Sequence, residues 1–523
     1  MIRRHPIRLL PTLALLWLAG GCATQPAGLS GNQLDVVVMR AMQEFGVPGA
    51  AVGVIKDGVV LHAAGYGVRE LGRPEPVDTQ TLFRVASTTK AMTASSLAIL
   101  VDEGRLGWDD KVVDHLSGFR MHDPWITREF TVTDLLTHRS GLGAYAGDLM
   151  LWPKPNSFTR ADIIDSLRYF QAASGFRARY AYDNQLYIVA GEIVPAVTGV
   201  EWEDFVDQRI FAALGTKRCF AGRIPGPEFA NLAAPHVAVE GRLEVVDRNR
   251  IDQETSVAAA AGGVRCSLDD MLRWVRLQLA RGQLPDGSRV YSEQQARMMW
   301  SPQTILGVAD EAYMRDQTHF RAYALGWRLA DVNGYLHVSH TGSFTGWNAY
   351  VVLIPELDLG AVVLINASAE GARQSIMQGI IKPWLGVDDV DWVTYYASSD
   401  GDDDEAETEP EVDWRGGSVL ASLAAYAGRY RDPWFGDVLV TEEDGALHFA
   451  AVKSPKMAGR LWPYEGHTFI ARFTDRTLDA DAWVEFSHDE AGEATGMELR
   501  AIYSSTDGSF NYGDLDLVRV REP

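Results

Sequence analysis

Apolar positions recur along this 523-residue chain with the periods of helices and of strands. Over residues 30–46 they return every three or four positions, which predicts an amphipathic helix that begins at Ser30. Two apolar runs, residues 50–55 and 59–64, flank a Lys-Asp-Gly turn and predict a β-hairpin. Both periods therefore occur within the first 65 residues.

A helical middle follows this hairpin. Residues 87–106 are rich in helix formers and predict a buried helix, and a mainly helical and loop region continues to about residue 282. Near its end, Ser267 is expected to cap an amphipathic helix that ends near Arg281, with Asp270 as its capping-box partner.

Strand patterns return after the helical middle. The expected strands, arranged as two hairpins, are residues 323–330, 335–340, 349–354 and 359–366, and a helix over residues 370–385 follows them. Strands at both ends of residues 30–386 imply one antiparallel sheet built from distant segments. The predicted fold class is therefore α+β, an antiparallel sheet flanked by helices with a helical subdomain, and not a repeated βαβ pattern.

The last part of the chain changes in composition. Residues 387–413 are rich in acids and predict a solvated linker, for which a calcium-binding role is the less favoured alternative. Residues 414–523 show short strand patterns between glycine and Asp-Gly turns, which predicts a separate small all-β domain, a barrel or a sandwich.

The first 22 residues have the composition of an export signal. Basic residues precede a short apolar run, which small residues and Cys22 follow. This end resembles a bacterial lipobox with Cys22 as the lipidated residue, although Ala19 stands where leucine is usual; cleavage after Ala23 is the alternative. We expect an exported protein of the periplasm, or an outer-membrane lipoprotein.

Charge and cysteine content narrow the function classes. The formal net charge of −22 argues against nucleic acid as a partner and favours a small neutral or cationic substrate, or a polymer of low charge. Beyond the signal only Cys219 and Cys266 remain, and their spacing does not decide whether they pair. No zinc-binding motif is present, so no metal site is expected.

Ser87 and Lys90 form a Ser-x-x-Lys at the start of the predicted buried helix. Positions three apart share one face of a helix, so the amine would lie beside the hydroxyl. A serine hydroxyl needs a proton acceptor to become a nucleophile, and burial at a helix start lowers the pKa of a lysine. Chance Ser-x-x-Lys pairs are common, so this motif alone does not decide function.

Two later stretches carry similar chemistry. Tyr182 and Asn184 form a Tyr-x-Asn in the helical middle, where a tyrosine with a lowered pKa would exchange a proton with serine and the amide would contact substrate and lysine. At the end of a predicted strand stand four further candidate residues, His340, Thr341, Gly342 and Ser343. The glycine would allow close approach of substrate, the Ser343 N–H would be an oxyanion donor beside that of Ser87, and a histidine titrating near neutrality would shuttle a proton or hold an anion.

The three motifs in this order resemble the serine β-lactamase and penicillin-binding-protein superfamily, in particular the class C β-lactamase-like branch with its esterases and D-amino-acid peptidases. Residues 135–141, a loop in which His138 is expected to be structural, add to the resemblance, which covers about residues 30–385. It implies the β-lactamase/DD-peptidase-like fold and acyl transfer through Ser87, with Lys90 and Tyr182 handling protons and no cofactor.

One departure affects the expected substrate. His340 occupies the position where the β-lactamase pattern has lysine, so we expect hydrolysis of small esters or amides, including peptides and peptidoglycan-like substrates, rather than strong β-lactamase activity. A β-lactamase or DD-peptidase proper, and an inactive sensor or cell-wall binder of the same fold, remain the alternatives. An α/β-hydrolase is disfavoured because no Gly-x-Ser-x-Gly occurs.

Overall fold

The computed structural model describes residues 28–224, 230–247, 256–387, 389–402, 417–504 and 506–521. The expected signal segment with Cys22 lies outside these residues. Among the helices within these residues, none is both long enough and apolar enough to cross a bilayer.

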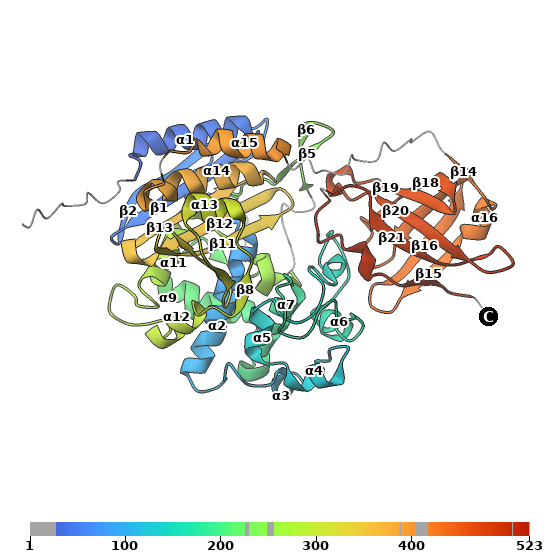
Figure 1. Ribbon diagram of the computed structural model, residues 1–523, viewed down its shortest axis with the longest axis horizontal. Coiled ribbons are helices and arrows are strands. Elements are labelled where there is room, and N and C mark those ends of the chain that lie inside the picture. Colours follow the sequence, from blue (N-terminus) through green and yellow to red (C-terminus); the bar gives the residue numbers. More distant parts are fainter. Residues whose placement is uncertain are drawn as a thin grey trace, which may run out of the picture.

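An eight-stranded sheet with the order β2-β1-β13-β12-β11-β10-β9-β8 forms the centre of the first domain (Figure 1). Its strands are β1 (Gly49–Lys56), β2 (Val59–Gly67), β8 (Thr304–Leu306), β9 (Arg321–Tyr323), β10 (Arg328–Val332), β11 (Tyr335–Phe344), β12 (Trp347–Ile354) and β13 (Leu359–Ile365). Every neighbouring pair is antiparallel. Because β1 pairs with β13, the two ends of the domain meet inside one sheet, which confirms the predicted α+β class.

Helices cover both faces of this sheet. On one face lie α1 (Gly31–Glu44), α14 (Glu370–Ile381) and α15 (Trp392–Asp402), and buried side chains such as Val38, Val352 and Ile376 fill the space beneath them (Figure 1). On the other face lie α2 (Lys90–Asp102), α11 (Leu268–Leu279) and the helical region. The domain therefore has two apolar layers, one on each side of the sheet.

The predicted strand over residues 323–330 is wrong in one respect. Strand β9 ends at Tyr323 and β10 begins only at Arg328, because the chain turns between them with Gly326 at a φ of +76°. The turn rests on the start of α2, where a Cβ added at Gly326 would lie 2.7 Å from the Lys90 carbonyl oxygen. A glycine is therefore required there by both conformation and space.

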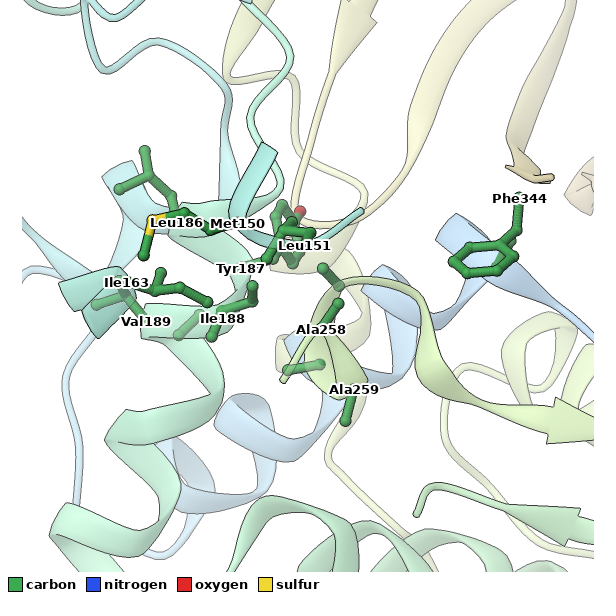
Figure 2. Close-up of a cluster of buried hydrophobic side chains, with 14 of the residues drawn as sticks. Met150, Leu151, Ile163, Leu186, Tyr187, Ile188, Val189, Ala258, Ala259 and Phe344 are labelled. Carbon is green, nitrogen blue, oxygen red and sulfur yellow. The ribbon is translucent and has the colours of Figure 1, made fainter. Parts of the chain in front are cut away.

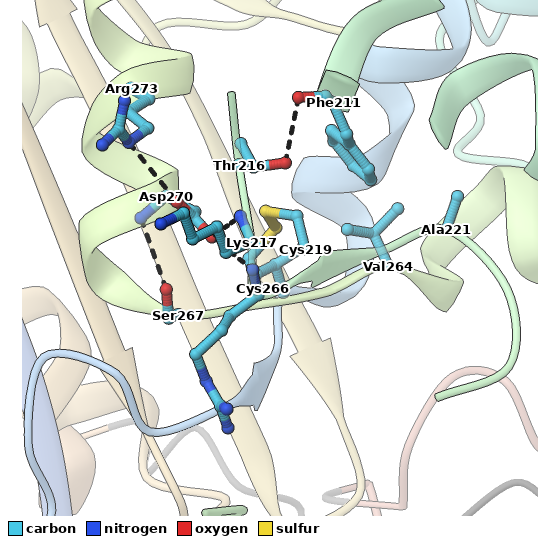
Figure 3. Close-up of a disulfide and its surroundings, with 12 residues drawn as sticks. Phe211, Thr216, Lys217, Cys219, Ala221, Val264, Cys266, Ser267, Asp270 and Arg273 are labelled. Carbon is cyan, nitrogen blue, oxygen red and sulfur yellow. Dashed lines mark hydrogen bonds and ion pairs between the residues drawn. A yellow bond between two sulfur atoms is a disulfide. The ribbon is translucent and has the colours of Figure 1, made fainter. Parts of the chain in front are cut away.

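The capping box expected for α11 is only half formed. The Ser267 hydroxyl accepts a hydrogen bond from the Asp270 N–H at 3.4 Å. The Asp270 carboxylate, however, accepts from the N–H groups of Lys217 and Arg218 at 2.9 and 2.6 Å (Figure 3). It ties a neighbouring strand to the helix instead of closing the cap.

Cys219 and Cys266 form a disulfide (Figure 3), which settles the pairing that the sequence left open. The bond lies in a small antiparallel sheet of β3 (Phe83–Arg84), β7 (Arg265–Cys266) and β4 (Cys219–Phe220). Since β3 leads directly into Ser87, the disulfide braces the segment that carries this serine.

The helical region is organised around α7 (Gln185–Thr198), a helix that is buried along its first three turns. Its side chains Leu186 and Val189 lie with Met150 and Ile163 in one apolar cluster (Figure 2). The cluster fixes the start of α7, where Asn184 is the residue before the first helical position.

The acidic composition of residues 387–413 predicts a linker, but part of this segment is folded. Residues Trp392–Asp402 form α15, and Trp392 and Val393 are buried. The acidic composition hides this helix because the aromatic and apolar residues near the start of the segment are buried against α14. Most of the acidic residues come later, towards the end of the segment. Residues 403–416 lie outside the described residues.

The C-terminal domain is a closed antiparallel barrel of eight strands, and the short β14 (Ser418–Val419) pairs in parallel with the end of β18 (Figure 1). The barrel strands are β15 (Gly428–Asp432), β16 (Gly436–Glu443), β17 (Ala446–Ala451), β18 (Ala458–Gly466), β19 (Thr468–Phe473), β20 (Ala482–His488), β21 (Ala494–Ala501) and β22 (Leu517–Arg519). Pairing of β18 with β19 closes the barrel. The prediction of a small all-β domain is confirmed.

Candidate active site

Ser87 lies where the chain passes from β3 into α2. A short 3₁₀ helix, Ala86–Thr89, connects the two elements, so the expected helix start is tighter than an α-helix. Ala86 has a φ of +46°, a left-handed conformation that costs energy for any residue with a Cβ. The strained turn is held in place by buried neighbours on both sides, and it presents Ser87 to the adjoining cavity.

Lys90 is completely buried beside Ser87. Its Nζ lies 3.2 Å from Ser87 Oγ, 2.7 Å from Asn184 Oδ1 and 2.9 Å from the Ala261 carbonyl oxygen. The pKa of the amine is lowered to about 7, chiefly by burial; the charge of Asp148 opposes this shift, and the positive charge of Arg328 contributes to it.

The three contacts of Lys90 define how its amine can act. Asn184 Oδ1 and the Ala261 carbonyl are acceptors, so each takes one N–H. In the neutral amine the lone pair then faces the remaining neighbour, the Ser87 hydroxyl. The geometry suits proton transfer from serine to lysine.

Tyr182 completes this group from the loop before α7. Its hydroxyl hydrogen bonds with the Ser87 side chain, and its ring lies 4.7 Å from the Lys90 Nζ. The expected lowering of the tyrosine pKa is wrong, because burial raises the pKa of Tyr182 well above its usual range. Tyr182 is therefore a neutral phenol, and the Lys90 amine is the group whose lowered pKa suits it to accept a proton.

Asn184 links the amine to a buried carboxyl group. Its Nδ2 donates to Asp148 Oδ2 at 2.7 Å while its Oδ1 accepts from Lys90. The expected contact between Asn184 and Lys90 is therefore present, with the asparagine as the acceptor, because its Nδ2 is taken up by Asp148. Burial raises the pKa of Asp148 well above its usual range.

Strand β11 passes directly behind the Ser87 turn. A Cβ added at Gly342 would lie 2.4 Å from the Val85 carbonyl oxygen and 3.1 Å from the Ser87 backbone nitrogen. Only glycine permits this approach. The sequence analysis expected the glycine to admit substrate, whereas the group that approaches it is the Ser87 turn of the same chain. The next residue, Ser343, lies on the wall of the cavity, and its hydroxyl donates to Glu370 at 2.7 Å and accepts from Arg373 at 2.9 Å.

His340 does not have the role expected from the sequence. Its Nδ1 lies 2.6 Å from the Thr341 carbonyl oxygen, so Nδ1 carries the hydrogen and Nε2 accepts from the Tyr323 hydroxyl at 2.9 Å. Burial, together with the charges of Arg328 and Lys90, lowers the pKa of His340 well below its usual value. The imidazole is neutral at physiological pH and cannot hold an anion by charge.

Arg328, which the sequence analysis did not identify, provides a positive charge next to His340 in the wall of the cavity. Its Nη1 donates to Thr341 Oγ1 at 3.0 Å and its Nη2 to the Tyr180 hydroxyl at 3.4 Å, and it lines the same cavity as Ser87. The available signal was a single charged residue within the apolar run of residues 322–330.

His138 is structural, as expected. It is buried with a φ of +53°, and its Nδ1 accepts from the Asp183 N–H at 3.0 Å. Its ring contacts those of Tyr182 and Tyr323, with centroids 4.3 and 4.4 Å away. The histidine holds the backbone and the ring of the segment that carries Tyr182.

A cavity of about 1120 Å³ opens in front of Ser87. Residues 477–479 and 506–510 of the barrel line it together with the first domain. The barrel is anchored beside this opening, because Asp514 Oδ2 accepts from the Gly147 N–H at 3.0 Å and the rings of Trp434 and Phe170 lie 5.0 Å apart. The second domain thus forms part of the cavity wall. Within the described ranges, no cluster of three or more side chains is suited to holding a metal ion.

Comparisons with known proteins agree with this architecture. Residues 34–383 match the family profile described as beta-lactamase, and residues 418–519 match one described as a domain of unknown function, DUF3471. The chain is 27% identical over 488 residues to an unguisins hydrolase of Aspergillus campestris, covering 87% of this chain and 88% of that protein. It is 28% identical over 354 residues to penicillin-binding protein 4 of Amycolatopsis lactamdurans, covering 66% and 86%.

Solved structures share the fold. An octameric penicillin-binding protein homologue from Pyrococcus abyssi has a TM-score of 0.57 at 21% identity, covering 94% of this chain and all of that one. A class C β-lactamase from Rhodobacter sphaeroides has a TM-score of 0.54 at 22% identity, covering 67% and 99%. With two thirds of its length matched by the family profile, the chain belongs to the beta-lactamase family of serine hydrolases, related to penicillin-binding proteins and extended by a C-terminal barrel.

Proposed function

We propose that this protein hydrolyses small esters or amides, peptides and D-amino-acid derivatives among them, through an acyl-enzyme on Ser87. The observation that carries the proposal is the contact of Ser87 Oγ with Lys90 Nζ at 3.2 Å, beside an amine whose pKa burial lowers to about 7. An amine of this kind is half neutral at physiological pH, which is what a general base requires.

The reaction follows from these positions. Ser87 Oγ attacks the substrate carbonyl carbon as its proton passes to Lys90 Nζ, and a tetrahedral oxyanion forms. In this proposal the N–H groups of Ser87 and Ser343 stabilise that oxyanion, and the close approach of β11 to the Ser87 backbone supports it. The Tyr182 hydroxyl, already bonded to Ser87, protonates the leaving group as the carbon–leaving group bond breaks, and regains its proton from Lys90. Water then attacks the ester carbon of the acyl-enzyme, and the same groups return the proton to Ser87.

Arg328 supports a preference for substrates that carry a carboxylate. It lies in the cavity wall, and its guanidinium is fixed by Thr341 and Tyr180. A planar guanidinium binds a carboxylate with two parallel hydrogen bonds, which a neutral imidazole at position 340 cannot provide. This observation favours carboxylate-bearing peptides and keeps a DD-peptidase or β-lactamase activity as the second candidate. The unguisins hydrolase, which this chain matches across both domains, supports a hydrolytic role.

A hydrolysis panel on the purified protein tests the proposal. p-Nitrophenyl esters, D-amino-acid amides, D-Ala-D-Ala peptides and nitrocefin separate esterase, peptidase and β-lactamase activity. Labelling by a fluorophosphonate separates a hydrolase from an inactive binder: we expect one label on the wild-type chain and none on a Ser87→Ala variant. A folded wild-type protein that takes no label and turns over no substrate would exclude the proposal.

We also propose that the protein is exported and anchored through a lipid on Cys22, with its substrate in the cell envelope. The arrangement of basic, apolar and small residues up to Cys22 supports this. Labelling with a palmitate analogue in a bacterial host should mark the wild-type protein and not a Cys22→Ser variant. An unlabelled wild-type protein would favour simple cleavage after Ala23.

A further inference from the structure

The cavity at Ser87 continues away from the reaction centre, across the face of the sheet that α14 covers. A helix that covers a sheet normally presents apolar side chains, as Ile376 and Ile380 do. Yet Gln374, Gln378 and Lys382, spaced four residues apart, line the cavity from the same helix and its 3₁₀ extension, Lys382–Leu385. A polar stripe on the inner side of a covering helix indicates a space that holds water or a polar ligand.

The opposing strands are polar in the same place. Arg321 of β9 pairs with Ala330 of β10, which pairs with His337 of β11, so all three occupy one row on one face of the sheet. Along β11 the alternation of a strand puts Ser339, Thr341 and Ser343 on that face as well, and all of these residues line the cavity. His337 and Ser343 are six positions apart, which corresponds to roughly 20 Å of strand.

We name the space between α14 and strands β9–β11 the distal groove. Helix α13 (Asp310–Asp316) contributes Ala312 and Asp316 to its lining, and Asp316 forms an ion pair with Lys382 at 2.6 Å. The side-chain amides of Gln374 and Gln378 bond to no other residue in the described part of the chain, although both are partly buried. They are hydrogen-bonding groups available to a ligand.

The two cationic side chains of the distal groove differ in whether a carboxylate pairs with them. Lys382 is neutralised by Asp316, but the Arg321 guanidinium contacts only the Gly307 carbonyl, at 3.5 Å, and forms no ion pair with any described carboxylate. The pKa of His337 is lowered to about 3, chiefly by burial and then by the charges of Lys382 and Arg321. Both cations therefore lie close enough to His337 to affect its protonation. A protein with net charge −22 therefore keeps one unpaired arginine in this half-buried place.

We propose that the distal groove binds the far end of an extended, peptide-like substrate, whose terminal or side-chain carboxylate is held by Arg321. Gln374 and Gln378 are about 6 Å apart along the helix and hydrogen bond with the amides of the ligand chain, while Ser87 acts on its near end. This rests on the proposed function, and it adds that the enzyme selects substrates roughly 20 Å long with a distant negative charge.

Binding to a Ser87→Ala variant tests the groove without turnover. Hexaglycine, an achiral chain long enough to reach from Ser343 to His337, is titrated in calorimetry as the free acid and as the C-terminal amide. We expect the acid to bind at least tenfold more tightly than the amide. An added Arg321→Met substitution should remove that difference, whereas Arg297→Met, which removes an exposed arginine of α12 (Glu293–Met299), should not.

Chain length separates the distal groove from the arginine near Ser87. Triglycine is too short to contact Ser87 and Arg321 together, so its free acid should bind at least tenfold more weakly than the free acid of hexaglycine. Equal binding of acid and amide hexaglycine, or equal binding of triglycine and hexaglycine, would overturn the proposal. Fluorophosphonate labelling of the wild-type protein is read separately: labelling without hexaglycine selectivity rejects the groove alone, and selectivity without labelling rejects the hydrolase and retains the groove.

Discussion

Replacement of Lys90 by methionine examines the proton transfer on which the proposed reaction depends. Methionine keeps most of the side-chain volume but has no amine, so Ser87 loses its proton acceptor. General base catalysis contributes about 10²- to 10⁴-fold to a rate, and each factor of ten corresponds to about 1.4 kcal/mol of activation free energy. We therefore expect acylation to slow by two to four orders of magnitude, or about 3–5 kcal/mol.

The same substitution leaves two buried acceptors without their donor, Asn184 Oδ1 and the Ala261 carbonyl. An unsatisfied buried polar group costs about 1–3 kcal/mol. In the variant this loss is partly offset, because no amine has to be desolvated on folding. We expect a folded protein of modestly reduced thermal stability. Circular dichroism and a melting curve verify this before kinetics are measured, and Lys111→Met serves as a control at a lysine that pairs with Glu129 away from the site.

The assay is the pre-steady-state burst of p-nitrophenol, followed as a function of pH. Because burial lowers the pKa of Lys90 to about 7, the base is neutral above that pH. The wild-type acylation rate should be full above pH 8 and fall about tenfold per pH unit below 6. The Lys90→Met variant should show a slow burst without this limb. A variant that keeps a near-normal burst rate and the same pH dependence would refute Lys90 as the base.

Three further predictions follow from the geometry. Tyr182→Phe should slow amide hydrolysis more than hydrolysis of p-nitrophenyl esters, whose leaving group needs no proton; an equal loss on both would reject Tyr182 as the acid. Arg328→Gln should raise the midpoint of the acid limb, since the Arg328 charge lowers the Lys90 pKa, and should reduce kcat/KM for carboxylate-bearing substrates relative to neutral esters; an unchanged profile and ratio would count against both roles. Replacing Cys219 and Cys266 by serine should lower stability by about 2–4 kcal/mol, read from the urea midpoint, and an unchanged midpoint would show that the surrounding strands suffice.

Local chemistry was the part of the site that could be predicted from sequence. Ser87 and Lys90 lie three residues apart, so their contact depends only on helical geometry. The glycine at position 342 indicated a close approach to the strand, but not that the approaching group is the Ser87 turn of this chain. Only the Ser87–Lys90 contact is determined within a few residues.

Properties set by distant segments could not be predicted. Tyr182 and His340 have pKa values governed by burial, which brings together Tyr323, Arg328 and the helical region. Arg328 was hidden inside a predicted strand because the turn at residues 324–327 exists only in contact with the start of α2. The helix α15 was missed because acidic composition outweighed a short apolar run at its beginning.

Hydrogen bonds hold the barrel against residues 144–147, beside the cavity that contains Ser87. This position affects which part of the chain can change the wall of that cavity. The beta-lactamase profile matches residues 34–383 and ends before the barrel, and the Rhodobacter β-lactamase matches 67% of this chain over 99% of its own length. Loops at the rim of a barrel tolerate sequence change without disturbing the buried amine and hydroxyl some distance away. Sequence change in residues 477–479 and 506–510 would therefore alter the wall of the cavity while Ser87 and Lys90 keep their positions.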